Sequence, residues 1–327
     1  MMIRVCGSRA AVWLAAVAFL WCGAMPAACQ TVGATPAKIV IRSWGYQLSN
    51  VEPAEIAASN FDAVVIDYAR DGTQKNALTA VDIERMKVKP DGSRRVVLAY
   101  LSIGEAEQYR YYWNSRWNWL WGWYRTFFGP KWLGAENRDW KGNFAVRYWM
   151  DEWQTLICGP GNSYLGRIIA AGFDGVWLDK VDSAFEAVAA TNKTAADDMV
   201  TFVTRIATRA RSERPGFLII PQNGEELLTN PQYRSMVDGM GAESLLFGDP
   251  DEKKPTAPDV QRKRLPLLSS LVAEGKPVLA VEYLDDPAPI AVARQRLQQM
   301  GFAPHFADRS LDNLRVTDVP SARAAKP

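Results

Sequence analysis

The sequence is poor in histidine and in cysteine. It contains a single histidine, His305, and four cysteines among 327 residues. A Ser-His-Asp triad needs a histidine beside its nucleophile, and a zinc site needs several histidine or cysteine ligands at short spacing. Neither arrangement is easy to build from these residues, so we expect no metal and no other cofactor. Acid and base chemistry would then fall to carboxylates.

Long hydrophobic runs are also scarce. The one candidate lies near the start, where Arg4 and Arg9 precede an apolar run over 10–21 and small residues follow it up to Cys29. This run is shorter than the roughly 20 apolar residues of a membrane span, and its flanks are typical of a secretory signal peptide. The sequence therefore predicts a signal peptide over 1–29, no membrane span, and export to the periplasm or the extracellular space.

Two outcomes of leader processing stay open. Cleavage near Ala28 would release the chain, whereas the stretch Pro26-Ala27-Ala28-Cys29 also resembles a lipoprotein site, in which Cys29 would carry a lipid anchor. Removing the leader leaves Cys158 and at most Cys29. An internal disulfide framework is therefore not expected, even in an oxidising compartment.

Neither sign of charge is in large excess. The formal net charge is +2, and the leader carries two basic residues and no acidic one, so the remainder of the chain is close to neutral. This balance argues against a surface that binds nucleic acid.

Apolar, β-branched runs alternate with helical stretches along the chain, which is the pattern of βαβ units and a parallel sheet. Helices are expected over 53–59, 79–87, 195–212, 259–274 and 289–300. Eight strands are expected, over 39–46, 63–68, 95–102, 175–179, 217–221, 237–246, 277–283 and 302–307. Eight strands with crossovers favour a closed (β/α)8 TIM barrel, here as one domain over 30–318 followed by a disordered tail over 319–327.

A long insertion rich in tryptophan follows the third expected strand. It spans 105–172 and holds nine of the thirteen tryptophans: Trp113, Trp117, Trp119, Trp121, Trp123, Trp132, Trp140, Trp149 and Trp153. Most of them are expected to form a satellite core beneath the insertion. Because sugar rings present flat C–H faces that stack on aromatic rings, a few are expected to line a substrate groove.

Acidic residues follow six consecutive expected strands. They are Asp67 and Asp71, Glu105 and Glu107, Asp179 and Asp182, Glu225 and Glu226, Glu243, and Glu282 with Asp285 and Asp286. The C-terminal ends of barrel strands surround the active site. Carboxylates that converge there repel one another, which raises some of their pKa values and suits general-acid catalysis. Glycoside hydrolysis needs one carboxylic acid and one carboxylate.

Asp179 and Glu243 are the best candidates for this pair. Asp179 ends the apolar run 175–178, although an Asp at that position could instead cap a helix. Glu243 has small neighbours that leave room for a substrate, although it could instead pair with a basic residue such as Arg147. Asp67 could contact substrate or hold other side chains, and Glu105 has the same two alternatives.

Three motifs resemble glycoside hydrolase family 114, the endo-α-1,4-polygalactosaminidase family and its bacterial and archaeal relatives. They are Ser43-Trp44-Gly45-Tyr46-Gln47-Leu48, Tyr100-Leu101-Ser102-Ile103-Gly104-Glu105-Ala106-Glu107 and Gly172-Phe173-Asp174-Gly175-Val176-Trp177-Leu178-Asp179. The resemblance runs from about 39 to 312 and continues through Asn223, Glu243 and Val281-Glu282-Tyr283. It implies a (β/α)8 barrel that hydrolyses α-1,4-linked galactosamine-rich polymers, with Asp179 and Glu243 at the positions of the family's catalytic residues.

The sequence departs from the fungal pattern at two places. Lys180 stands where an Asn usually follows the strand-four Asp, and Gly241-Ala242 replace the residues before Glu243. Strand-end position and resemblance together predict substrate contacts for Tyr46, Asp67, Tyr100, Glu105, Asp182, Asn223, Glu282 and Tyr283. The expected partner is a polysaccharide, an amino-sugar polymer. A barrel that binds polysaccharide without cleaving it, and an exported carbohydrate deacetylase, are the alternatives.

Overall fold

The computed structural model describes residues 40–119, 129–251 and 254–314. All of the described residues belong to one unit of the chain, over 38–327. The expected signal peptide, the alternative lipid anchor at Cys29 and the expected tail over 319–327 lie outside them. Within the described ranges, no helix combines the length and the apolar character needed to cross a membrane.

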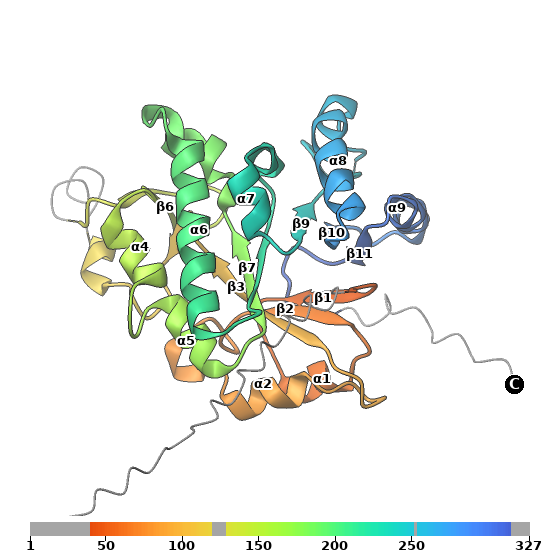
Figure 1. Cartoon of the computed structure of the whole chain (residues 1–327), viewed down its shortest axis with the longest axis horizontal. Helices are drawn as coiled ribbons and strands as arrows, with labels where there is room; N and C mark the ends of the chain where they lie inside the picture. The colour runs from red at the N-terminus through yellow and green to blue at the C-terminus, as the bar shows by residue number, and fades with distance from the viewer. Residues whose placement is uncertain (1–39, 120–128, 252–253, 315–327) are drawn as a thin grey trace, which may run out of the picture. The chain divides into compact units, whose positions relative to one another are not determined.

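Eight parallel strands form the centre of the described unit (Figure 1). Five of them pair in the order β1-β2-β3-β7-β8, and three pair in the order β9-β10-β11. Their bounds are β1 Trp44–Gln47, β2 Ala63–Ile66, β3 Val96–Ser102, β7 Gly175–Asp179, β8 Leu218–Pro221, β9 Met240–Glu243, β10 Val278–Glu282 and β11 Ala303–Phe306. All eight expected strands are present.

Two contacts join the two sheets into a ring. Gln222, directly after β8, forms a parallel bridge with Gly241 of β9. On the other side, the indole Nε1 of Trp44 in β1 donates to the carbonyl of Ala303 in β11 at 2.9 Å. The expected (β/α)8 barrel is therefore confirmed.

Helices lie along the outer side of the strands (Figure 1). The eight α-helices of the described residues are α1 Pro53–Ala58, α2 Ala80–Met86, α4 Asp151–Cys158, α5 Tyr164–Ala171, α6 Ala195–Glu213, α7 Pro231–Met236, α8 Pro258–Ala273 and α9 Pro287–Gln299. The five expected helices are α1, α2, α6, α8 and α9. Helices α4, α5 and α7 were not expected, because two lie inside the insertion and α7 is short.

Most strands are slightly shorter than expected, and two of them are much shorter. The first begins at Trp44 because the carboxylate of Asp62 accepts the backbone N–H groups of Arg42 and Ser43, which takes them out of the ladder. The sixth ends at Glu243 because Ser244 has φ 52°, a left-handed conformation that an extended strand cannot continue.

The insertion after β3 contains its own small sheet. Strands β4 Glu105–Glu107, β6 Asn143–Val146 and β5 Leu133–Glu136 pair antiparallel in that order. As expected, most of the tryptophans that can be assessed pack into a core, namely Trp113, Trp117, Trp132, Trp149 and Trp153. Trp140 differs, since 53% of its surface is exposed. Trp121 and Trp123 lie outside the described residues.

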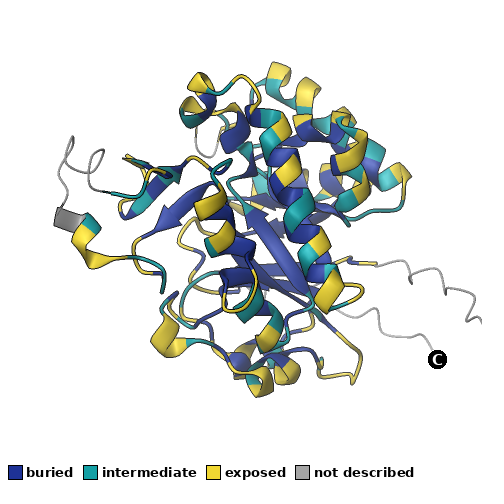
Figure 2. Ribbon diagram, turned by 60° about the vertical axis from the view of Figure 1, so that its left-hand side comes forward, coloured by how far each residue is buried: buried dark blue, intermediate teal, exposed yellow. Residues whose placement is uncertain are grey.

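The barrel strands have apolar side chains on both faces, as expected for a parallel barrel. Nearly all of their residues are buried (Figure 2). In β2, Val64 and Ile66 point outward and pack with the helices, whereas Val65 belongs to the inner cluster with Leu98 and Trp177. Large inner side chains fill the barrel, so its interior is a packed core and not a channel.

Arg95 secures the N-terminal end of the barrel. Its side chain is fully buried just before β3. The guanidinium donates to the carbonyls of Phe61 at 3.0 Å, Met86 at 2.6 Å and Ser59, which joins the ends of α1 and α2 to the sheet. This end of a TIM barrel contributes stability, while the opposite end carries the chemistry.

Arg95→Met should lower the free energy of unfolding by ~3 kcal/mol, because it leaves buried carbonyls without a donor. Urea denaturation measures this change. Arg94→Met is the matched control: its side chain is 64% exposed, so its effect should stay within ~0.5 kcal/mol. Equal stability of the two variants would contradict this role for Arg95.

Candidate active site

A cavity of about 820 Å³ opens at the C-terminal ends of the barrel strands. Each of the eight strands, or the segment that follows it, contributes to its wall. Acidic side chains predominate there, namely Asp67, Asp71, Glu105, Glu107, Glu136, Asp139, Asp179, Asp182, Glu186 and Glu243. Lys180 and Arg309 are the basic residues among the described ones that line it. The acids that follow the second, third, fourth and sixth expected strands are thus gathered around one opening, whereas Glu225, Glu226, Glu282, Asp285 and Asp286 do not line it.

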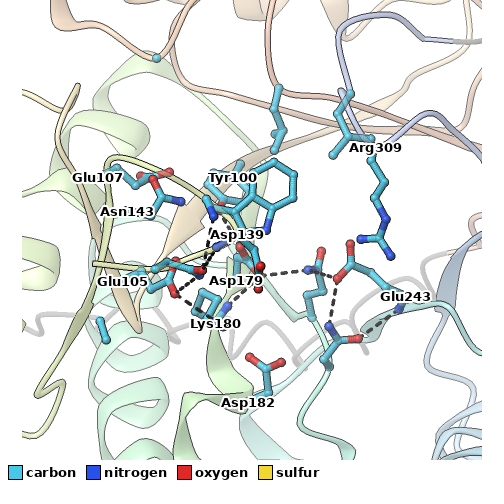
Figure 3. Close-up of a pocket in the computed structure, with 18 of the residues that line it drawn as sticks. Tyr100, Glu105, Glu107, Asp139, Asn143, Asp179, Lys180, Asp182, Glu243 and Arg309 are labelled. Carbon is cyan, nitrogen blue, oxygen red and sulfur yellow. Dashed lines mark hydrogen bonds and ion pairs between the residues drawn. The ribbon is translucent and has the colours of Figure 1, made fainter. Parts of the chain in front are cut away.

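Asp179, the last residue of β7, projects into this cavity (Figure 3). Its Oδ2 accepts the hydroxyl of Tyr100 at 2.6 Å, and its Oδ1 accepts the backbone N–H of Lys180 at 2.8 Å. Burial raises the pKa of Asp179 to about 7, and the nearby carboxylate of Glu243 adds to this effect. The turn that follows has no side-chain cap, so the capping alternative does not account for this residue.

Glu243, the last residue of β9, faces the same cavity. Its Oε1 accepts the hydroxyl of Tyr283, and its Oε2 accepts the side-chain amide of Asn223 at 3.1 Å. The alternative pairing with Arg147 is wrong, because Arg147 is exposed and donates to the carbonyl of Lys131.

One amide nitrogen joins the two carboxylates. Nε2 of Gln222 donates to Oδ1 of Asp179 at 2.9 Å and to Oε2 of Glu243 at 2.8 Å. The two N–H bonds of an amide diverge by about 120°, so the oxygens that they reach lie ~5 Å apart. This separation is typical of the carboxyl pair of retaining glycosidases, whereas inverting enzymes need ~6.5–9.5 Å.

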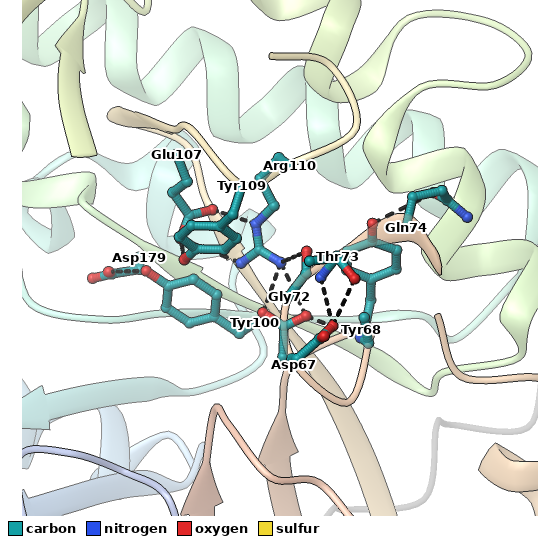
Figure 4. A network of polar contacts seen from close by, with 12 residues as sticks. Asp67, Tyr68, Gly72, Thr73, Gln74, Tyr100, Glu107, Tyr109, Arg110 and Asp179 are labelled. Atoms are coloured by element: carbon teal, nitrogen blue, oxygen red, sulfur yellow. Dashed lines mark hydrogen bonds and ion pairs between the residues drawn. The ribbon is translucent and has the colours of Figure 1, made fainter. Parts of the chain in front are cut away.

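A buried ion-pair network supports the wall beside Asp179 (Figure 4). The fully buried guanidinium of Arg110 contacts Asp67 at 2.7 Å and Glu107 at 2.6 Å. It also lies over the ring of Tyr100, 5.9 Å from the centroid. The carboxylate of Asp67 therefore holds Arg110, and only 2% of Asp67 is exposed at the cavity. Of the two alternatives for Asp67, this arrangement favours the supporting one.

Glu105 and Asp182 differ in how strongly their carboxylates are held. Glu105 accepts the side-chain amide of Asn137 at 2.9 Å and lies 3.8 Å from the ammonium of Lys180. Burial raises the pKa of Glu105. Asp182 lines the cavity and forms no close ion pair with another described residue; burial raises its pKa to about 6, although the charge of Lys180 opposes this. Asp182 is therefore the more accessible of the two to a substrate cation.

Glu282 requires a correction. Its side chain is fully buried and does not line the cavity. Its two oxygens accept the backbone N–H groups of Leu246 at 2.9 Å and Phe247 at 3.0 Å, so it holds the segment that follows β9. Tyr46, Tyr100, Asn223 and Tyr283 line the cavity, and their contacts with a substrate stay a prediction.

Three residues that contribute to the site were not among the predicted ones. Gln222 lies beside Asn223 at the end of β8, but a search for carboxylates passes over an amide. Arg110 lies three residues after Glu107, a spacing that is compatible with an ion pair. Arg264 of α8 donates to the carbonyl of Glu243 and to Asn223, and it comes from a helix whose approach to β9 only the fold reveals.

In the described parts of the chain, no group of three or more His, Cys, Asp or Glu side chains has an arrangement that could hold a metal ion. The chemistry that these residues support is acid and base catalysis by a pair of carboxyl groups.

A sequence model of the glycoside-hydrolase family GH114 matches residues 24–320. An uncharacterized protein of Methanocaldococcus jannaschii is 38% identical over 289 residues, which cover 84% of this chain and 78% of that protein. An uncharacterized protein of Thermotoga maritima is 35% identical over 306 residues, which cover 89% of this chain and 88% of that protein.

Two solved structures share the fold. The glycoside hydrolase domain of PelA from Pseudomonas aeruginosa has a TM-score of 0.62 at 19% identity and covers 84% of this chain and 98% of that domain. Ega3 of Aspergillus fumigatus, in complex with galactosamine, has a TM-score of 0.61 at 17% identity. The match covers 86% of this chain and 97% of the Ega3 chain. At these identities the likeness shows the barrel alone. The match over 24–320 and the two relatives above 30% identity show that the chain belongs to glycoside hydrolase family 114.

Proposed function

We propose that this glycosidase cleaves α-1,4-linked galactosamine-rich polysaccharide with retention of the anomeric configuration, using Asp179 and Glu243. The observation that carries the proposal is the shared hydrogen-bond donor. Nε2 of Gln222 contacts both carboxylates, so the two groups lie within reach of one glycosidic bond at the cavity floor.

The spacing of the pair supports a two-step reaction. One carboxyl group protonates the leaving glycosidic oxygen while the other, as a carboxylate, attacks the anomeric carbon and forms a glycosyl-enzyme ester. The first group, now ionised, then removes a proton from water, and the resulting attack at the anomeric carbon releases the sugar and the second carboxylate. A separation of ~5 Å leaves no space for water between the pair and the sugar in the first step.

The charge of the cavity supports an amino-sugar substrate. Among the described residues, ten acidic and two basic side chains line it, and the fully buried Arg110 neutralises part of this excess from behind. A wall of one sign concentrates ligands of the opposite sign. A polymer that carries free ammonium groups matches this wall, whereas a uronic acid polymer would be repelled.

We also propose that the chain is exported. The basic residues and the apolar run before Cys29 support a cleaved leader. N-terminal sequencing of the mature protein tests this: a start between 27 and 32 is expected, and an intact leader on protein that stays in the cytoplasm would contradict it. A lipid on Cys29 would be detected as an added mass on the N-terminal peptide.

Asp179→Asn and Glu243→Gln should each lower kcat on a galactosamine polymer by ~10³-fold or more, because each removes one half of the pair. Release of reducing ends measures the rate. Both variants should still bind the polymer, since the remaining wall is unchanged. Asp91→Asn, an exposed acid in a turn, is the control and should keep full activity. Unchanged cleavage by Asp179→Asn would contradict the proposal.

Activity should decline as the pH rises through about 7. The pair must hold one proton and one charge, and the raised pKa of Asp179 indicates that this proton is lost near pH 7. The pH dependence of kcat measures this. Amines of the polymer also titrate, so polymer binding to Glu243→Gln over the same range serves as the control. Full activity up to pH 9 would contradict a shared proton.

The first product should carry the α-anomeric configuration, because two inversions at one carbon restore the original one. Proton NMR during the first minutes of the reaction distinguishes the anomers before mutarotation mixes them. Initial appearance of the β-anomer would show inversion and would contradict the ~5 Å separation.

Trp140→Ala should raise KM for long polymers several-fold and leave kcat nearly unchanged. Trp140 is exposed at the cavity wall, on the turn between β5 and β6, where a sugar ring could stack on it away from the catalytic pair. Phe185→Ala is the matched control, because Phe185 is equally exposed at 51% and does not line the cavity. Equal KM values for the two variants would contradict a stacking role.

A further inference from the structure

We propose that Gln222 is the positioning residue of the catalytic pair: its amide, oriented by the indole of Trp177, fixes the separation of Asp179 and Glu243. This inference rests on the proposed function and deepens it. Gln222 transfers no proton and attacks no carbon, so it acts through the two carboxylates.

The orientation of the amide follows from its neighbours. Oε1 of Gln222 accepts the indole Nε1–H of Trp177 at 2.6 Å and the hydroxyl of Tyr46 at 3.2 Å. An indole nitrogen can only donate, so the atom that faces it must be the amide oxygen. The NH₂ group then faces the cavity, where each of its hydrogens meets one carboxylate. All four hydrogen-bonding sites of this side chain are engaged, and only 4% of the residue is exposed.

Trp177 is itself fixed within the barrel. Its side chain is fully buried. The centroid of its ring lies 5.2 Å from the ring centroid of Trp44 and 5.5 Å from that of Tyr46. The ring also passes directly over Gly241 of β9. A Cβ at that position would lie 2.1 Å from the ring, which no side chain could accommodate. Gly241, one of the two departures from the fungal pattern, therefore makes room for the indole that orients Gln222.

The amide also affects the charge of the pair. Two like charges ~5 Å apart repel, and a donor placed between them stabilises both ionised forms. Without that donor, both ionised forms would lose a hydrogen bond, and the pair would keep its proton to higher pH. A residue that merely filled space would not change the pH at which this proton is lost.

Gln222→Met tests the inference, because methionine keeps the length of the side chain and removes both donors and the acceptor. We expect kcat to fall ~10²-fold, as for a displaced catalytic group, with KM changed less than ~3-fold. The falling limb of the pH profile should move upward by at least half a pH unit. Gln298→Met, on the exposed face of α9, is the matched control and should match the wild type in both readouts.

Trp177→Phe is the second variant. It keeps an aromatic ring in the barrel and removes the N–H that orients the amide, so the same upward shift of the pH profile is expected with a smaller loss of kcat. If Gln222→Met proves too unstable to purify, the pH profile of Trp177→Phe tests the inference instead. A folded Gln222→Met or Trp177→Phe protein with an unchanged pH profile would overturn the inference, even if its kcat were reduced.

A titration separates this inference from the proposed function. Carbon-13 NMR of the labelled Asp179 and Glu243 carboxyl groups reports their protonation without any substrate. If the wild type cleaves no galactosamine polymer, the proposed function fails. The inference about Gln222 is then still tested by the titration, in which Gln222→Met should raise the pH of these transitions. Identical transitions in the wild type and the variant would overturn it.

Discussion

The site depends on one hydrogen-bond donor held between two acids. Gln222 can donate to Asp179 and Glu243 at once only because its carbonyl is held by groups inside the barrel. Trp177 supplies the decisive contact, and the absence of a side chain at Gly241 gives the indole its place. The geometry of the site therefore depends on the packing of the core, because a shift of the indole would move the amide and both carboxylates.

Around this centre, charge is distributed in two ways. Behind the wall, Arg110 compensates Asp67 and Glu107 in a dry environment, where an unpaired acid would cost several kcal/mol. At the cavity itself, Asp182 has no comparably close cation among the described residues, and it stays available to a cationic ligand. The buried pairs maintain the shape of the wall, and the accessible acids give the cavity its negative potential.

The sequence predicted the barrel well because its eight apolar runs are bounded by turn residues and recur with helices between them. It also predicted that Asp179 and Glu243 would share a cavity, because strand ends converge in this fold. Glu282 ends a strand in the same way, yet it faces backbone N–H groups behind the wall. Strand position does not specify which way a side chain turns, and the roles of Gln222 and Arg264 arise from contacts between distant segments.

The central claim is that one of two named carboxyl groups forms an ester with the substrate. A galactosamine-derived inactivator that forms a slowly hydrolysed glycosyl-enzyme, followed by peptide mass spectrometry, tests this claim most directly. One added sugar mass is expected, located on the peptide that contains Asp179 or Glu243. Labelling of a different residue, or turnover of the polymer with no ester formed on either side chain, would contradict it.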